Sequence, residues 1–316
     1  MVRELNPGFR SAGQGRAMTP SKTSIFKAYW LAVRPWSFTM TIVSLAAGSA
    51  VAAAEGPLHW GWLAITGVSL ICFHGGANVL NDYFDTRNQV DRPDSPTALY
   101  RAHPHWAGLL TPAQLLKETL ALLGLAGFLG LIIAYRSPQA LWIGFLGLAA
   151  AVFYTGKPLA YKYRGWGEPA VFLVWGPLMV EVAYTAQRQS LSWPALLVSL
   201  PLGAWVAMVL MANNLRDIES DRLSRITTLA HIMGPKWGYR FWAATLAATY
   251  LFSLGLILAG LCGPWLALIF LSAPLSFKLI KRFAQGLPDA ADAQTAQVGL
   301  YFGLLFVAGL ALGTLA

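Results

Sequence analysis

The sequence is poor in charged residues and almost devoid of cysteine. Only 12% of its 316 residues are charged, and acidic residues are the scarcer kind, with 14 Asp and Glu against 23 Lys and Arg. The two cysteines, Cys72 and Cys262, both fall within apolar stretches. This placement supports neither a disulfide framework nor a zinc site with Cys/His spacing.

The sequence also lacks the amphipathic spacing of a soluble helical protein. Hydrophobic residues make up 56% of the chain and come in long blocks. A helix needs about 20 apolar residues to cross the hydrocarbon core, and such blocks predict an all-α membrane protein with about nine transmembrane helices. The predicted spans are 36–55, 60–80, 113–134, 138–156, 169–187, 194–212, 240–261, 264–280 and 294–315.

Positive charge is distributed unequally between the predicted connections. Of the 23 Lys and Arg residues, only Arg136 and Arg188 fall on one side of the membrane, and the other 21 fall on the opposite side. Because Lys and Arg accumulate in cytoplasmic loops, the N-terminus is expected in the cytoplasm of a multi-pass protein of the cell inner or plasma membrane.

The domain organisation predicted from this pattern is simple. Residues 1–24 form a basic cytoplasmic segment without fixed structure, and they lack the apolar core and cleavage site of a secretory signal. Residues 25–316 form a single transmembrane domain. The net charge of +9 lies in loops next to the membrane, where it attracts anionic lipid headgroups, so we expect membrane lipids and no nucleic acid as partners.

The most informative feature is an acidic cluster where the second predicted span ends. Asn78 and Asp82 are four residues apart, and Asp85 follows after three more, so a continuing helix presents all three on one face. Asp91 follows where Arg92 and Pro93 end the helix and the loop can fold a further carboxylate back.

A second cluster follows the sixth predicted span. Asn213, Asp217 and Asp221 repeat the four-residue spacing, 135 residues after the first cluster, which indicates a weak internal repeat. Carboxylates gathered at membrane depth repel one another unless a cation compensates them. Mg²⁺ is the natural candidate, because it prefers oxygen ligands and binds carboxylates together with phosphate oxygens. Nearby basic residues suit a substrate diphosphate.

Two other interpretations remain open at this point. Each cluster alone could be a solvated helix end, although two matching clusters on one membrane face make this much less probable. A cation-coupled transporter could also carry intramembrane carboxylates and a weak repeat. It should place them near the bilayer midplane in broken helices, whereas these lie at span ends.

Several single residues have both a functional and a structural interpretation. Tyr154 could shelter a cationic intermediate with its aromatic face. Tyr163 and Trp166 are interpreted as anchors at the membrane interface. His74 is interpreted mainly as a buried packing histidine, and Glu168 as a carboxylate that favours a helix start.

Together these residues resemble the UbiA superfamily of intramembrane prenyltransferases. The resemblance covers nearly the whole chain and includes Arg34-Pro35-Trp36-Ser37 and Asn213-Asn214-Leu215-Arg216-Asp217. The second stretch is similar to the branch that prenylates 1,4-dihydroxy-2-naphthoate. The 4-hydroxybenzoate branch has Tyr and Lys where this chain has Leu210 and Asn213. The chain departs from the family pattern at Lys157 and Arg225.

The resemblance implies a UbiA-like bundle with a cytoplasm-facing active site, Mg²⁺ as cofactor, and an isoprenyl diphosphate donor with an aromatic or lipid acceptor. Other acceptors in the superfamily are homogentisate, tetrapyrroles and glycerol phosphate ether lipids. The implied metal ligands are Asp82, Asp85, Asp217 and Asp221. The same four, with Asn78, Arg101 and Tyr154, are the implied catalytic residues. The implied substrate-binding residues are Asn78, Asp91, Arg87, Arg101, Lys162, Asn213, Asn214 and Arg216.

Overall fold

The computed structural model describes residues 24–88, 90, 103–224 and 226–315. Within these ranges the regular secondary structure is helical, and the only β-type pairing is an isolated parallel bridge between Arg164 and Thr227. This confirms the predicted all-α class. The predicted N-terminal segment and the calls on Asp91, Arg101 and Arg225 lie outside the described residues.

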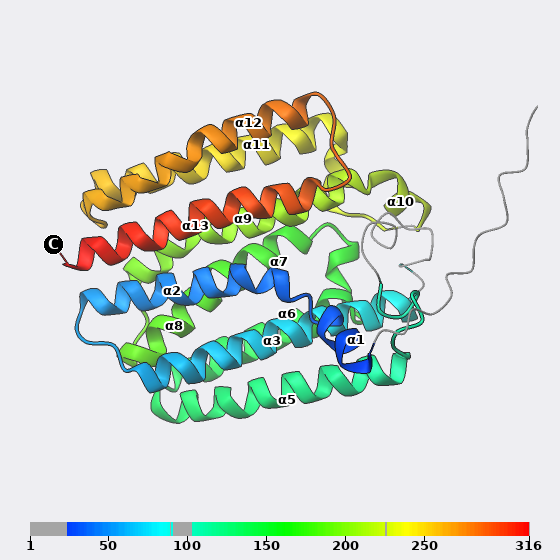
Figure 1. Ribbon diagram of the computed structural model, residues 1–316, viewed down its shortest axis with the longest axis horizontal. Coiled ribbons are helices and arrows are strands. Elements are labelled where there is room, and N and C mark those ends of the chain that lie inside the picture. The colour runs from blue at the N-terminus through cyan, green and yellow to red at the C-terminus, as the bar shows by residue number, and fades with distance from the viewer. Residues whose placement is uncertain (1–23, 89, 91–102, 225, 316) are drawn as a thin grey trace, which may run out of the picture.

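The helices are shown in their order along the chain in Figure 1. The α-helices are α1 (Ile25–Ala32), α2 (Phe38–Ala54), α3 (Trp60–Arg87), α5 (Pro112–Arg136), α6 (Gln139–Thr155), α7 (Gly167–Leu173), α8 (Met179–Arg188), α9 (Trp193–Arg216), α10 (Ile218–Leu223), α11 (Leu229–Leu258), α12 (Ala273–Ala284) and α13 (Ala291–Leu315). Shorter helical turns are η1 (Pro35–Ser37), η2 (Tyr161–Tyr163), η3 (Val174–Leu178) and η4 (Pro264–Ser272).

Seven helical segments of the described chain are long and apolar enough to cross a membrane. They correspond to seven of the predicted spans. The predicted spans 138–156 and 264–280 correspond to α6, which has 17 residues, and to η4 followed by α12. These two are shorter or less regular than the others, so the count of nine stays a prediction.

The long helices lie side by side in one bundle (Figure 1). α2, α9 and α13 contact one another, α3 packs against α5, and α11 packs against α9. The outer faces are apolar: Phe128 on α5 and Trp142 on α6 are 62% and 69% exposed. Such large exposed apolar faces are suited to lipid rather than to water. The protein is therefore a multi-pass membrane protein.

The long axis of the bundle separates two ends of different character. The C-terminus lies at one end, and α1, α10 and the C-terminal end of α3 gather at the other (Figure 1). Both acidic clusters belong to this second end, because they occupy the last turns of α3 and the junction of α9 with α10.

Two helices meet almost backbone to backbone where α9 crosses the α7–η3 segment. A Cβ atom added to Gly203 would lie 2.5 Å from the carbonyl oxygen of Phe172 and 3.0 Å from the Cα atom of Gly176. η3 is a single π-helical turn that contains Pro177, which has no amide proton for a helical hydrogen bond. The absence of a side chain at Gly203 thus allows α9 to approach the irregular turn closely.

We expect Gly203→Ala to destabilise the bundle by about 1–3 kcal/mol, because the added methyl group overlaps backbone atoms that cannot move away. Gly124→Ala on α5 is the matched control, since nothing lies within 4 Å of the added atom. Thermal unfolding of the two variants in detergent measures the difference. Equal transition temperatures would contradict the close-packing interpretation.

Candidate active site

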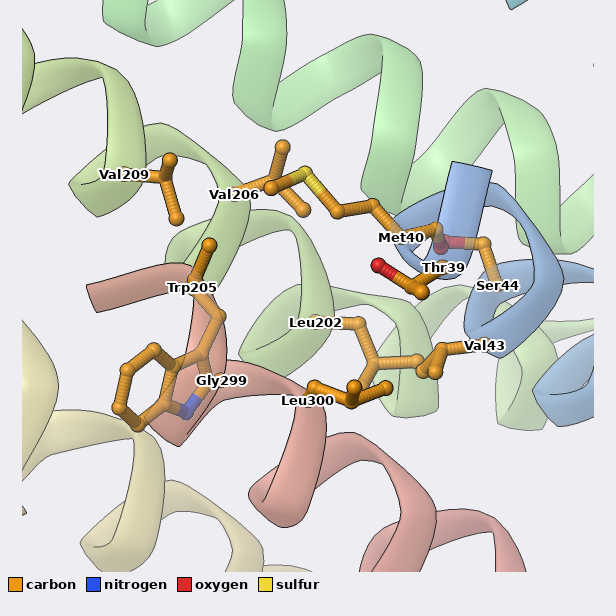
Figure 2. A pocket seen from close by; sticks show the side chains of 11 residues that line it. Thr39, Met40, Val43, Ser44, Leu202, Trp205, Val206, Val209, Gly299 and Leu300 are labelled. Carbon is orange, nitrogen blue, oxygen red and sulfur yellow. The ribbon is translucent and has the colours of Figure 1, made fainter. Parts of the chain in front are cut away.

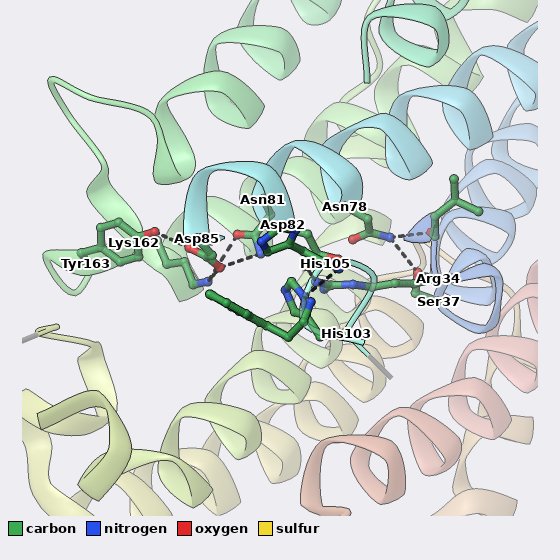
Figure 3. Close-up of polar contacts among 12 residues, drawn as sticks. Arg34, Ser37, Asn78, Asn81, Asp82, Asp85, His103, His105, Lys162 and Tyr163 are labelled. Atoms are coloured by element: carbon green, nitrogen blue, oxygen red, sulfur yellow. Dashed lines mark hydrogen bonds and ion pairs between the residues drawn. The ribbon is translucent and has the colours of Figure 1, made fainter. Parts of the chain in front are cut away.

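The first acidic cluster is paired with cations from distant parts of the chain (Figure 3). Asp82 is fully buried and forms an ion pair with Arg34, which lies just before η1. Asp85 is 2% exposed and accepts hydrogen bonds from Lys162 Nζ at 2.8 Å, from Asn81 Nδ2 at 2.9 Å and from the hydroxyl group of Tyr163. Both buried carboxylates therefore have positive groups or hydrogen-bond donors as partners.

The break between α1 and α2 positions Arg34 for this role. Arg34 has a left-handed backbone conformation with φ of 55°, and Pro35 follows it. Ser37 Oγ donates to the carbonyl oxygen of Arg34 at 2.7 Å, and Asn78 Nδ2 donates to the carbonyl oxygen of Val33 at 3.0 Å and to Ser37 Oγ at 3.2 Å. Asn78 thus ties α3 to the break from which Arg34 reaches Asp82.

The second cluster carries its own cation. Arg216 binds both oxygens of Asp217 at 2.7 Å, and it also contacts Asn213 and, on α13, Asp292. Asn214 is directed differently: its Nδ2 donates to Glu168 Oε1 at 2.9 Å. Glu168, interpreted from sequence as a helix-start carboxylate, does lie in the first turn of α7 and holds Asn214 as well.

A cavity of about 530 Å³ brings the two clusters together. Its wall includes Asn78 and Asp85 from the first cluster, Asn213 from the second, and Lys162 and Tyr154 from the segment between them. Of the four predicted metal ligands, Asp85 is on this wall, whereas Asp82, Asp217 and Asp221 are not. Most of the remaining wall is apolar or aromatic.

The pKa of Asp221 reflects an electrostatic interaction between the two clusters. Burial, the charge of Asp217 and the charge of Asp85 raise the pKa of Asp221 to about 7, against the opposing effect of Lys162. Asp85 and Asp221 are 136 residues apart in sequence. Their charges interact because the fold places the end of α3 close to the start of α10.

The described residues contain no group of three or more His, Cys, Asp and Glu side chains arranged to hold a metal ion. The donor set nevertheless fits Mg²⁺ bound together with a diphosphate. Its carboxylates and amides are oxygen donors, and Asp221 Oδ2 is buried with no hydrogen-bond partner among the described residues. Mg²⁺ needs only one or two carboxylates when phosphate oxygens and waters complete the shell.

Aromatic residues surround the lysine of the site. Lys162 Nζ lies 5.6 Å from the centre of the Tyr154 ring and 5.8 Å from that of Tyr163, within range of cation–π attraction. The sequence-based interpretation of Tyr163 as a membrane anchor is wrong, because its hydroxyl group bonds Asp85; burial and the Asp85 charge raise the pKa of Tyr163. Trp166, by contrast, is 64% exposed, as an anchor should be.

The remaining predicted residues have varied positions. Arg87 is exposed, and its Nη1 atom donates to the Tyr83 hydroxyl group at 3.0 Å rather than lining the cavity. His74 is buried as expected for a packing histidine, with its ring nitrogens 3.1 Å from Ser37 Oγ and 2.7 Å from Thr41 Oγ1.

Sequence reasoning missed several contributors to this site, among them Arg34 as the partner of Asp82, Asn81, Tyr163 as a partner of Asp85, and Asp292. Asn81 lies four residues before Asp85 on the helix, so the spacing that revealed Asp82 and Asp85 could have revealed it. Asp292 carried a weaker signal, as an isolated carboxylate just before the last predicted span. Tyr163 had no local signal that separates a site residue from an interfacial one.

The comparisons with known proteins agree with this geometry. The UbiA prenyltransferase family matches residues 41–305. A 1,4-dihydroxy-2-naphthoate octaprenyltransferase of Bacillus subtilis is 30% identical over 303 residues, covering 94% of this chain and 96% of the relative. Human UbiA prenyltransferase domain-containing protein 1 is 33% identical over 293 residues, covering 90% and 83%.

Solved structures show the same fold at low sequence identity. A UbiA homologue from Aeropyrum pernix K1 superposes with a TM-score of 0.64 at 16% identity, covering 86% of this chain and 98% of the homologue. A homologue from Archaeoglobus fulgidus, bound to GPP and Mg²⁺, superposes with a TM-score of 0.62 at 14% identity, covering 92% and 100%.

The family match and the relatives place this helical membrane protein among the intramembrane prenyltransferases. The chain belongs to the UbiA prenyltransferase family, since the family match spans most of its length. It is therefore a prenyltransferase enzyme.

We expect Arg34→Gln to lower the free energy of unfolding by about 3 kcal/mol, because it removes the cation that faces fully buried Asp82. Arg34→Gln combined with Asp82→Asn should lose less than Arg34→Gln alone, since no charge then stays buried. The exposed Arg87→Gln is the control for loss of positive charge at this end. Thermal or denaturant unfolding measures all three, and an Arg34→Gln variant as stable as Arg87→Gln would refute the prediction.

Proposed function

We propose that this enzyme transfers an isoprenyl chain from a polyprenyl diphosphate to 1,4-dihydroxy-2-naphthoate in menaquinone biosynthesis, releases pyrophosphate and depends on Mg²⁺. The observation that carries the proposal is the single cavity onto which residues of both acidic clusters converge. The name of the Bacillus subtilis relative supports the acceptor, because the two chains match over nearly their full lengths.

The polar residues of the cavity wall suit the diphosphate. Mg²⁺, held by Asp82, Asp85, Asp217 and Asp221 with the diphosphate oxygens, would supply positive charge that stabilises the leaving pyrophosphate. Lys162 adds a second positive charge at the same wall, to which Asn78 and Asn213 also contribute amide groups. The roles of Asp91, Arg87, Arg101 and Asn214 in substrate binding stay predictions from the sequence.

The aromatic residues of the cavity wall suit the reacting carbon. When the allylic carbon–oxygen bond breaks, the electron pair leaves with pyrophosphate and the allylic carbon becomes cationic. Tyr154 presents an aromatic face to the cavity, which can shelter this cation from water. The electron-rich acceptor ring then forms the new carbon–carbon bond and loses the ring proton.

A second, smaller cavity, here called the apolar extension, shares wall residues with the main cavity. This cavity of about 30 Å³ lies between α2, α9 and α13, lined by residues such as Val43, Leu202 and Leu300 (Figure 2). It shares Met40 and Val209 with the wall of the main cavity. A chain that leaves the main cavity between these residues would stay among apolar side chains.

The orientation of the protein is part of the same proposal. The active site would face the cytoplasm of a cell inner or plasma membrane, with the N-terminus on the same side, because 21 of 23 Lys and Arg residues belong to the connections at that end.

The function is tested by product formation with purified protein, farnesyl or geranylgeranyl diphosphate, 1,4-dihydroxy-2-naphthoate and Mg²⁺, with and without EDTA. We expect a prenylated naphthoate and pyrophosphate in equal amounts, and loss of both with EDTA. Homogentisate and a glycerol phosphate ether lipid serve as competing acceptors in parallel reactions. Product with one of these and not with the naphthoate would overturn the proposed acceptor while leaving the prenyl transfer in place.

Variants of the two clusters separate chemistry from folding in this assay. Asp82→Asn and Asp217→Asn should each lower kcat at least about 1,000-fold, because both remove charge where the leaving pyrophosphate must be stabilised. Asp289→Asn is the matched control, since its carboxylate is exposed near the start of α13. Near-normal activity in either cluster variant would contradict the proposed site.

We expect Val209→Trp to block the apolar extension at its junction with the main cavity. The value of kcat/KM for long-chain diphosphates should fall about tenfold more than the value of kcat/KM for geranyl diphosphate. Val68→Trp, at a position that is 50% exposed on the outer face of α3, is the size-matched control. An equal fall for short and long donors would place the chain elsewhere.

A further inference from the structure

The side chain of Arg216 is more deeply buried than contact with a substrate would require. Its side chain is 5% exposed at the end of α9. Its Nε atom donates to Asp217 Oδ1 at 2.7 Å, and its Nη2 atom donates to Asp217 Oδ2 at 2.7 Å and to Asn213 Oδ1 at 2.9 Å. Its Nη1 atom donates to Asp292 Oδ1 at 3.0 Å and to the carbonyl oxygen of Asp289 at 2.8 Å.

These five contacts use the full donor capacity of the side chain. A guanidinium group carries five N–H bonds in a fixed plane, and here each has an acceptor within the protein. A diphosphate could bind Arg216 only by displacing one of these acceptors, two of which are carboxylates. Breaking such a buried, charge-assisted contact is costly.

The position of Arg216 relative to the cavity agrees with this reading. Asn213 and Asp292 both line the cavity, one from α9 and the other from α13, whereas Arg216 does not. The guanidinium group therefore lies behind the wall and connects two residues that form it. Lys162 differs in this respect, because it lies on the wall itself.

Arg216 also connects three separate pieces of the site. It grips both oxygens of Asp217, which fixes the orientation of that carboxylate at the α9–α10 junction. It holds the carbonyl oxygen of Asp289 just before α13 and the carboxylate of Asp292 in the first turn of α13. This turn and the next supply Asp292 and Ala296 to the cavity wall.

We propose that Arg216 and Asp292 form a positioning clamp rather than a diphosphate contact. The clamp orients Asp217 and fixes the start of α13 as one wall of the substrate cavity. This inference rests on the proposed function for its kinetic consequences, but its structural content can be measured without turnover. It gives Arg216 a different role from the diphosphate contact expected from the sequence.

The first part of the test compares Asp292→Asn with Asp289→Asn, which removes an exposed carboxylate three residues away and keeps the carbonyl group that Arg216 contacts. We expect Asp292→Asn to lower kcat about tenfold and to change the KM for farnesyl diphosphate less than about twofold, because orientation and not ground-state binding is lost. Asp289→Asn should behave like the wild type.

The second part uses Arg216 itself. Arg216→Gln should lower kcat at least as much as Asp292→Asn. The double variant with Arg216→Gln and Asp292→Asn should have the same kcat as Arg216→Gln alone, since both substitutions remove the same clamp. Arg216→Lys should not restore activity, because an ammonium group cannot bridge two carboxylates with a planar fork. Arg282→Gln on α12 is the exposed arginine control.

Hydrogen exchange of residues 289–296 provides the readout that needs no reaction. Faster exchange there in Asp292→Asn and Arg216→Lys, and not in Asp289→Asn, would support the clamp even if the proposed acceptor is wrong. Unchanged exchange would overturn it. The clamp would also be overturned if Arg216→Gln raised the KM tenfold at constant kcat while Asp292→Asn had no effect. If Asp292→Asn does not fold, Arg216→Lys carries the same comparison.

Discussion

The compensation of buried carboxylates is the constraint on which the rest of this structure depends. Asp82 and Asp85 are almost completely buried at the end of an apolar bundle, where an uncompensated charge would be very unfavourable. Arg34 and Lys162 supply the opposite charge, and neither belongs to α3. These ion pairs therefore fix the positions of the two irregular segments that carry the cations, which are the α1–α2 break and the η2 loop. Lys162 then contributes to the cavity wall from η2.

The two clusters share a sequence spacing but are compensated in different ways. The cations of the first cluster come from distant segments, whereas Asp217 is bound by the residue directly before it, Arg216, which reaches on to Asp292. The repeat seen in the sequence therefore describes the spacing of the acidic residues and not their supporting contacts. Since Arg216 reaches α13, the second cluster is tied to the last helix, while the first is tied to the segment before α2. Together they fix both of these flanking elements around the cavity.

The sequence was sufficient for the parts of the structure that depend on local pattern. Apolar blocks of membrane-spanning length predicted the helices. The spacing of Asn78, Asp82 and Asp85 predicted that these residues share one face of a helix, because both features follow from helix geometry. Three of the ion pairs join residues 48, 77 and 76 positions apart, and no local pattern specifies such partners. The same limit explains Tyr163: an aromatic residue beside a charged loop has the same local appearance whether it faces lipid or a carboxylate.

The cavity wall combines charged groups with aromatic side chains, and these suit different parts of the proposed substrates. A diphosphate with its cation can exchange ionic partners with Asp85 and Lys162, since each of these groups already faces an opposite charge. The proposed naphthoate acceptor combines an aromatic ring system with a carboxylate, and the rings of Trp36, Phe73 and Tyr154 on the wall can stack against its rings. In the proposed reaction the two acidic clusters serve the donor, whereas the acceptor must be matched by side chains outside the clusters. For this reason the acidic motifs identify the reaction more securely than they identify the molecule that is prenylated.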